Sequence, residues 1–252
     1  MSEPIDFTKD DPTGGTDEGF DNELVRRESW PVSGVAELEL SVDVGRIEVH
    51  FDRADEPEVQ VEVRHDPGAG GMWGQGISGV LSWIGQATAG PDAEPADLAA
   101  EAVHAAEITW SEPGRRLIVR SSQDLPLRVV PLVVTVTAPA GSRLAARTGA
   151  GDVVVTGRAG WAAVRTGSGE VDVAAVDGDT DVTTGSGDLV LGEVAGRARL
   201  RTGSGTVRLT AAGGPTEIKA RWVAPPFAVE IVGLPTSCKA TNLKAASGTL
   251  EP

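Results

Sequence analysis

The chain has 252 residues, of which 22 are Lys or Arg and 37 are Asp or Glu, so its formal net charge at pH 7 is −15. A protein this acidic lacks the basic surface typical of nucleic-acid-binding proteins, and anionic membranes would repel it. Hydrophobic residues make up 40% of the chain and aromatic residues only 4%, which predicts a largely aliphatic core. The single cysteine, Cys238, cannot form an internal disulfide, which excludes a disulfide scaffold.

No targeting signal is recognisable in the sequence. The chain starts Met1-Ser2-Glu3-Pro4, without the basic and apolar regions of a signal peptide. No apolar run approaches the roughly 18 residues that a membrane-spanning helix needs. We therefore expect a cytoplasmic location without membrane insertion, although leaderless export would leave no mark in the sequence.

The N-terminal region is rich in acidic residues. Nine acidic and three basic side chains fall within residues 1–30, among few apolar ones. Such a composition cannot bury enough apolar surface to offset the entropy lost on ordering. The sequence therefore predicts a disordered acidic tail over residues 1–32, with a solubilising role favoured over an interaction role.

From residue 33 onward apolar and polar residues alternate, which is typical of β-strands. A turn at Gly45-Arg46 separates the first two alternating stretches. We expect these strands to form early, divergent turns of the same fold as the repeats that follow. The alternating stretches are 38–44, 47–51, 59–63, 117–119 and 132–136.

Residues 66–107 interrupt this pattern and predict a helical insertion. Apolar residues from Trp73 to Ile84 recur at helical spacing, although glycines weaken this helix. Residues 96–108 are rich in Ala and Glu and predict a second helix. The insertion holds no Lys or Arg to contact lipid headgroups, so we expect it to pack on the sheet or cap it.

A fourfold repeat of 18 residues covers residues 147–218. The units begin RTGAGD, RTGSGE, TTGSGD and RTGSGT, and each has aliphatic residues at its seventh, ninth and eighteenth positions. One unit cannot bury its aliphatic face alone, but stacked units share one continuous core. The sequence predicts an all-β fold: a single-stranded β-solenoid with 18-residue rungs over residues 33–250, a small helical insertion, and an atypical C-terminal cap at 219–250.

The recurring T-G-S-G-[D/E]-V-x-V unit is preceded by V-T-V-x-A-P-A-G-S at residues 134–142. This combination resembles the bacterial putative-adhesin family of β-strand repeat proteins, over roughly residues 35–250. The resemblance implies a β-solenoid of unassigned biochemical role. It also implies an adhesin-like repeat scaffold, by analogy between repeat folds.

The sixth position of the repeat is acidic in three successive units: Asp152, Glu170 and Asp188. Arginine occupies the first position in three units: Arg147, Arg165 and Arg201. One interpretation is a row of exposed ion pairs across the turn, each worth about 0–1 kcal/mol. The alternative is a calcium site formed by the three acidic residues, since calcium prefers carboxylate and carbonyl oxygens. Ion pairs are favoured, because only half of each 18-residue coil carries the motif.

A carbohydrate-active β-helix enzyme is a further alternative. Adjacent carboxylates in such a row approach the spacing of about 5–5.5 Å found in retaining glycosidases. Catalysis, however, needs one place with distinct acid and base environments, and each rung repeats the same edge. The scattered histidines His50, His65 and His104 suggest no triad, and no nucleotide-binding or nucleophile motif is complete.

The sequence therefore predicts a non-enzymatic structural or interaction module of unassigned biochemical role, with no catalytic residues, cofactor or metal. A calcium-stabilised surface adhesion protein and a carbohydrate-active enzyme remain the alternatives. A protein is the expected class of partner, nucleic acid is excluded, and the oligomeric state stays open.

Overall fold

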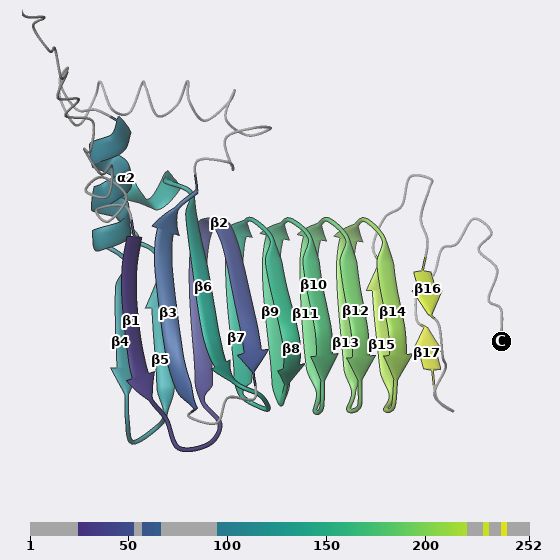
Figure 1. Cartoon of the computed structure of the whole chain (residues 1–252). Coiled ribbons are helices and arrows are strands. Elements are labelled where there is room, and N and C mark those ends of the chain that lie inside the picture. The colour runs from purple at the N-terminus through teal and green to yellow at the C-terminus, as the bar shows by residue number, and fades with distance from the viewer. Residues whose placement is uncertain (1–24, 53–56, 67–94, 221–228, 232–237, 241–252) are drawn as a thin grey trace, which may run out of the picture.

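Alternating apolar residues produce an all-β fold, as predicted, because each strand can bury one face. In this computed structural model the described residues are 25–52, 57–66, 95–220, 229–231 and 238–240. The strands form two facing layers, which we name sheet A and sheet B (Figure 1). Within the described ranges, no helix is both long and apolar enough to cross a bilayer.

The strand β2 (Glu37–Asp52) runs through both sheets and joins them into one hydrogen-bonded array. The described helical elements are α2 (Pro95–His104) and the short 3-10 helix η2 (Leu127–Val129). Sheet A also contains β1 (Val25–Pro31), β3 (Glu58–His65), β6 (Leu132–Pro139), β8 (Val153–Ala159), β10 (Val171–Val176), β12 (Leu189–Val194), β14 (Val207–Ala212) and β16 (Val229–Ile231). Sheet B also contains β4 (Glu107–Ser111), β5 (Arg116–Arg120), β7 (Arg143–Ala150), β9 (Trp161–Ser168), β11 (Thr180–Ser186), β13 (Ala198–Ser204), β15 (Thr216–Ala220) and β17 (Cys238–Ala240).

The strands of the repeat region pair in parallel and in one register. Val171 of β10 pairs with Val153 on one side and Leu189 on the other, each 18 positions away in the sequence. In sheet B, β11 pairs with β9 and β13 at the same separation. A bulge at Gly157, whose φ is 76°, shifts the register locally, so that Ala175 pairs with Arg158.

Strand β2 occupies the place of one repeat unit. Its first half pairs with β7 in sheet B, and its second half pairs with β8 in sheet A. The chain changes sheets at Gly45, where φ is 126°, so the turn predicted at Gly45-Arg46 is confirmed. The divergent early strand thus stacks directly on the first repeat, although about 90 residues separate them in the sequence.

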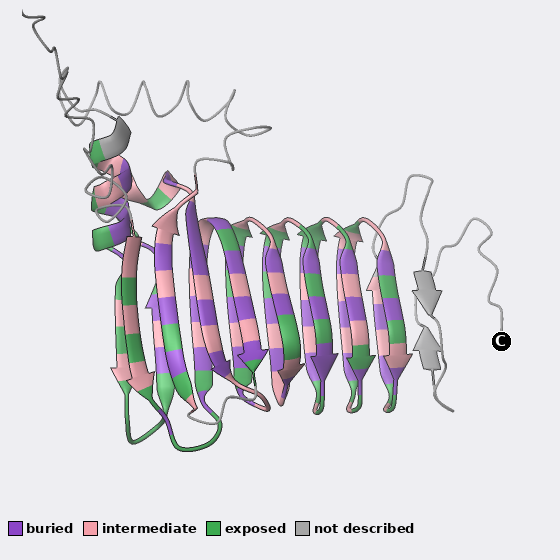
Figure 2. Ribbon diagram, in the orientation of Figure 1, coloured by how far each residue is buried: buried purple, intermediate pink, exposed green. Residues whose placement is uncertain are grey.

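Aliphatic rows run along the stack between the two sheets (Figure 2). The prediction that residues 153, 171, 189 and 207 face inward on neighbouring strands is confirmed, since all four are 0% exposed. Burying a Val or Leu side chain contributes about 1.5–3 kcal/mol relative to leaving it exposed. These rows are therefore the main source of stability in the repeat region.

Strands β1 and β4 close the N-terminal end of the stack. Each pairs with a single antiparallel neighbour, β3 and β5 respectively. Trp30 of β1 stacks on Trp110 of β4, with ring centroids 5.6 Å apart and planes inclined by 14°. Helix α2 lies against β1 and β3 at this end (Figure 1).

The predicted domain boundaries need correction at two places. Residues 25–31 form β1, so the predicted disordered tail is wrong there, because pairing with β3 and the Trp30 contact order this segment. Helix α2 confirms the second predicted helix, but Glu107 already begins β4. The predicted helix at 73–84, the rest of the tail and most of the predicted cap lie outside the described residues. Within the cap, β16 and β17 pair with residues 22 positions earlier, so the 18-residue spacing ends here as expected.

Candidate binding surface

The T-G-S-G turns stack into a ridge along the end of the two sheets. Buried threonines close three of the turns: the Thr166 hydroxyl donates to the Ser168 carbonyl at 3.0 Å, and Thr184 and Thr202 make the same contact with Ser186 and Ser204. Gly187 has φ 129°, and a Cβ there would lie 2.1 Å from the carbonyl oxygen of Gly169. Glycine is required because the turns stack backbone against backbone.

The predicted acidic row lies on the sheet A flank of this ridge. Asp152 Oδ1 accepts a hydrogen bond from the Glu170 backbone N–H at 2.9 Å, and Asp188 Oδ1 accepts one from Thr206 at 2.6 Å. The Asp152 carboxylate also lies 3.4 Å from the Arg46 guanidinium. The aspartates therefore tie each rung to the next through its backbone.

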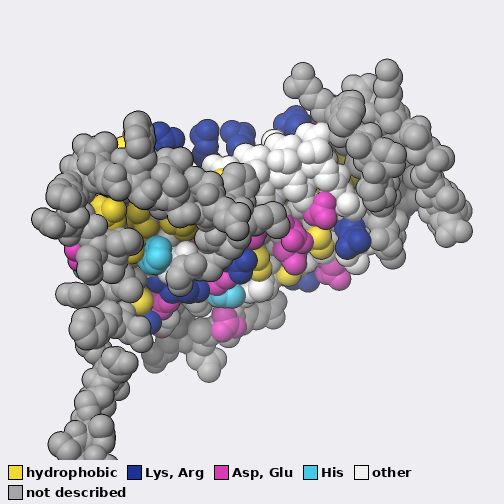
Figure 3. Space-filling model, turned by 90° about the horizontal axis from the view of Figure 1, so that it is seen from above, with side chains coloured by type: hydrophobic (Ala, Val, Ile, Leu, Met, Phe, Trp, Pro, Cys, Tyr) yellow, Lys and Arg dark blue, Asp and Glu magenta, His cyan; other side chains and the backbone are white. Residues whose placement is uncertain are grey.

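The predicted ion pairs across the turn are wrong for the described residues. The arginines of the first repeat position precede the turn on sheet B, whereas the acidic residues follow it and begin sheet A. Figure 3 shows a row of Lys and Arg side chains along one flank of the ridge, and Asp and Glu side chains mixed with Lys and Arg along the other. The turn reverses the chain between sheets, so neighbours in sequence face opposite sides. Arg201 instead lies 3.9 Å from Asp181.

The three residues of the calcium alternative do not gather around one point. Calcium needs six to eight oxygen ligands, but Asp152 and Asp188 each direct Oδ1 at a backbone N–H. In the part of the chain that the structure describes, no group of three or more His, Cys, Asp or Glu side chains is placed to hold a metal ion. The arrangement supports backbone hydrogen bonding by these carboxylates.

A different cluster stands out on the outer face of sheet B, where β7 and β9 lie side by side. We name it the alanine window, because two alanines pair at its centre and larger side chains pair above and below them. The guanidinium carbon of Arg143 lies 5.1 Å from the ring centroid of Trp161. The window consists of the cross-strand pairs Arg143–Trp161, Ala145–Ala163 and Arg147–Arg165.

Charged clusters on both sides of the window are satisfied internally. On one side Glu39 binds Arg116 and, at 2.8 Å, Arg120. Hydrogen bonds from Arg120 and then Arg116 hold the pKa of Glu39 below its ordinary value. On the other side Asp181 lies 3.6 Å from Arg199, which also contacts Glu217 at 3.2 Å. Each arginine of these flanking clusters therefore already has a carboxylate partner.

Two arginines of the window, Arg147 and Arg165, differ from the arginines of the flanking clusters. Neither Arg147 nor Arg165 forms an ion pair or hydrogen bond with another described residue, and both are exposed. They are directly opposite each other on adjacent strands, about 4.8 Å apart in backbone spacing, where like charges destabilise a sheet. Two guanidinium groups so placed can each bind a carboxylate or phosphate in bidentate fashion. Next to them, the alanine methyl groups and the Trp161 ring offer apolar contact.

The sequence suggested Arg147 and Arg165 only as ion-pair partners of the acidic row, and it did not predict the window. The signal was nevertheless present: the fifteenth, seventeenth and first positions of successive units alternate along one strand, and therefore share one face. Trp161 and Ala163 hold the fifteenth and seventeenth positions of the first repeat, and Arg165 holds the first position of the second. Recognising the face required tracing alternation across the boundary between units.

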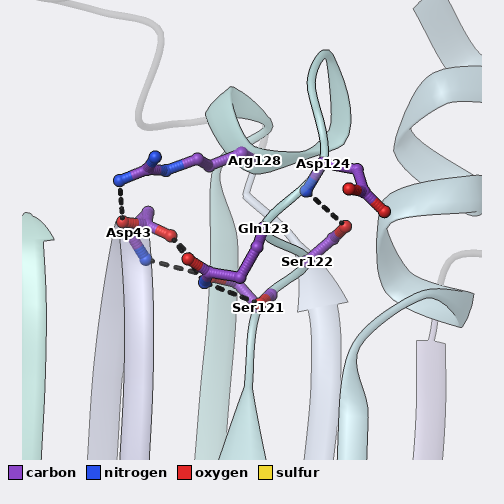
Figure 4. A network of polar contacts seen from close by, with 6 residues as sticks. All are labelled: Asp43, Ser121, Ser122, Gln123, Asp124 and Arg128. Atoms are coloured by element: carbon purple, nitrogen blue, oxygen red, sulfur yellow. Dashed lines mark hydrogen bonds and ion pairs between the residues drawn. The ribbon is translucent and has the colours of Figure 1, made fainter.

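Two other polar features are weaker candidates. A shallow groove of about 360 Å³ lies on sheet A over β1, β3 and β6, but an Arg27–Glu62 ion pair at 2.8 Å already pairs its charges. Near the ridge, the Asp43 carboxylate binds Arg128 at 3.1 Å and Gln123 at 3.3 Å (Figure 4). This network holds the loop after β5 against β2, and its charged groups pair with one another.

The three histidines lie at separate places in the fold. His50 contacts Thr156 on the outer face of sheet A, with Nδ1 2.7 Å from the hydroxyl. His65 ends β3, where burial lowers its pKa, and His104 ends α2. These positions belong to separate elements of the fold.

No protein-family model matches the sequence, and no curated protein matches it. Several solved structures are similar at low identity. A putative adhesin from Bacteroides fragilis is 12% identical, with coverage of 86% of this chain and 97% of that chain and a TM-score of 0.37. A putative cell adhesion protein from Clostridium sporogenes is 10% identical, with coverage of 83% and 100% and a TM-score of 0.34. A putative lipid binding protein from Parabacteroides distasonis is 6% identical, with coverage of 88% and 98% and a TM-score of 0.24. Because every TM-score is below 0.5, we draw no functional conclusion from these similarities.

Proposed function

We propose that this chain is a non-enzymatic interaction module: a single-stranded β-solenoid with 18-residue rungs that binds a partner on the outer face of sheet B. The observation that carries the proposal is the alanine window, where the exposed Arg147 and Arg165 face each other without a carboxylate among the described residues. The partner is a protein segment that presents Asp or Glu next to an aromatic or aliphatic side chain.

The solenoid assignment is supported by the register and by the turns. Paired residues 18 positions apart recur in both sheets. The same Thr and Gly contacts recur from turn to turn. A stack of this kind offers long, flat faces whose side chains are fixed by the sheet, and such surfaces suit binding to extended partners.

The chemistry of the window supports binding over catalysis. Its six side chains are arginine, alanine and tryptophan, which include no nucleophile and no general acid or base that titrates near neutral pH. Two fixed guanidinium groups supply charge recognition, while Trp161 supplies flat contact area. This combination accounts for a basic patch on a protein whose net charge is −15.

The test measures the affinity of the full chain for a labelled peptide rich in Asp, Glu and Phe. Fluorescence anisotropy at low ionic strength reports the binding. Replacing Arg147 and Arg165 with Glu is expected to weaken binding about tenfold or more, because two attractive contacts become repulsive. The matched control replaces Arg64 and Arg208 with Glu, which makes the same charge change on the outer face of sheet A. Equal affinity of the window variant and the wild type would contradict the proposal.

A further inference from the structure

We infer that the acidic N-terminal segment, residues 1–24, is an intramolecular ligand of the alanine window and competes there with an external partner. The inference rests on the window of the proposed function. Its experimental readouts, however, depend on the chain's own N-terminal segment, so the inference can fail while the proposed function stands.

Charge identifies this segment among those outside the described residues. Residues 1–24 contain eight acidic side chains and one lysine. Residues 67–94 contain only Asp92 and Glu94, and the stretch 241–252 has one acidic and one basic residue. Residues 1–24 are therefore the strongest internal source of carboxylates for Arg147 and Arg165.

The composition of the segment also matches the apolar part of the window. Phe7 follows Asp6, and Asp10 and Asp11 come shortly after it. A phenylalanine beside carboxylates can cover the methyl groups of Ala145 and Ala163 while its neighbours bind guanidinium groups. The same stretch therefore supplies both kinds of group that the window can bind.

The strand register places the start of the described chain at the end of the sheets that carries the T-G-S-G ridge. Val25 lies opposite Arg64, Arg64 opposite Val133, and Val133 opposite Arg46, which directly follows the turn at Gly45. The tail therefore leaves the fold at the end where the T-G-S-G ridge lies. Arg147 and Arg165 each precede one of those turns by one residue.

The segment is long enough to reach the window. Trp30 stacks on Trp110, so β1 lies next to β4, the edge strand of sheet B. From β4 to β7 the path crosses β5 and β2, which is three strand spacings or about 15 Å, and the two sheets are about 10 Å apart. At about 3.3 Å per extended residue, some eight residues cover this path. Asp6 through Asp11 can therefore lie on the window, and the remaining chain acts as a tether.

Tethering makes weak contacts sufficient. A short flexible link gives an effective concentration in the millimolar range, so the segment needs only millimolar affinity for the window, which the guanidinium–carboxylate contacts and the apolar contact of Phe7 supply together. The contacts remain sensitive to salt, because the Debye length falls from about 10 Å at 0.1 M to about 3 Å at 1 M. A carboxylate-rich partner with higher affinity would displace the segment.

The experiment compares the full chain with a variant in which all eight acidic residues of the segment become Asn or Gln. Phenylglyoxal modification of arginines is followed by mass spectrometry at low salt. Arg147 and Arg165 are expected to react about threefold or more slowly in the wild type than in the variant. Arg208, on β14 of the opposite sheet, should react equally in both chains, and 1 M salt should remove the difference between the chains at Arg147 and Arg165.

Equal modification rates of Arg147 and Arg165 in the two chains at low salt would overturn the inference. The labelled acidic peptide provides the second readout, since neutralising the tail should raise its affinity severalfold by removing a competitor. Peptide binding that is unaffected by the tail would sink the inference but leave the proposed function standing. Tail-dependent protection without any peptide binding would support the inference and count against the external partner.

Discussion

Replacing Gly187 with alanine is expected to lower the free energy of unfolding by about 3–5 kcal/mol. The residue has φ 129°, a conformation that side chains with a Cβ rarely adopt, and the new Cβ would lie 2.1 Å from the carbonyl oxygen of Gly169. Neither backbone can move away easily. Gly187 N–H donates to Ser204 at 2.9 Å, and Gly169 N–H donates to Ser186 at the same distance.

The matched control for this substitution is Gly114→Ala. Gly114 lies in the turn between β4 and β5, where the nearest atom to an added Cβ is 3.7 Å away. We expect its effect to stay within about 0.5 kcal/mol, because no clash or unusual φ opposes the methyl group. Urea denaturation of both variants measures the difference. If the Gly187→Ala variant were as stable as the wild type, successive turns would not stack backbone against backbone.

Replacing Leu189 with alanine is expected to destabilise the chain by about 2–5 kcal/mol, through lost burial and the cavity left behind. Leu189 is fully buried and lies between Val171 and Val207 on the neighbouring strands. The adjacent Val190 faces outward between Asp172 and Arg208. Val190→Ala should therefore cost well under about 1 kcal/mol.

Chemical denaturation of these two variants checks which face of β12 is inside. A larger loss for Val190→Ala than for Leu189→Ala would reverse the assignment of the two faces. Because the substitutions are one residue apart in the same strand, differences in strand propensity are small compared with the expected effect.

The repeat region could be predicted from the sequence because its information is redundant. In a stack of equal rungs each side chain lies beside its counterpart 18 positions away, so Thr166, Thr184 and Thr202 share one environment and one residue type. The turn at Gly45 was predictable for a related reason, since apolar alternation stops and restarts there.

Strand β1 could not be predicted in the same way. Its residues alternate between half-buried and exposed, and its sequence VRRESWP has as many charged residues as apolar ones. What orders it is the pairing of Trp30 with Val59 and its stacking on Trp110, residues about 30 and 80 positions away. Long-range contacts of this kind leave no period in the local sequence.

The candidate site shows the opposite limitation. Arg147 and Asp152 are close in sequence, and this proximity suggested an ion pair, but the intervening turn moves the chain from sheet B to sheet A. Conversely, Arg143 and Trp161 are 18 positions apart and form a cation–π contact at 5.1 Å. In a stack of rungs, the repeat length rather than sequence distance determines which side chains meet.

The side-by-side position of residues 18 apart is tested most directly by NMR of the methyl-labelled full chain. Nuclear Overhauser contacts are expected between Val171 and Leu189, between Leu189 and Val207, and between Val182 and Leu200. Each of these pairs is buried in the interior. The absence of all three contacts would contradict the architecture on which the binding surface depends.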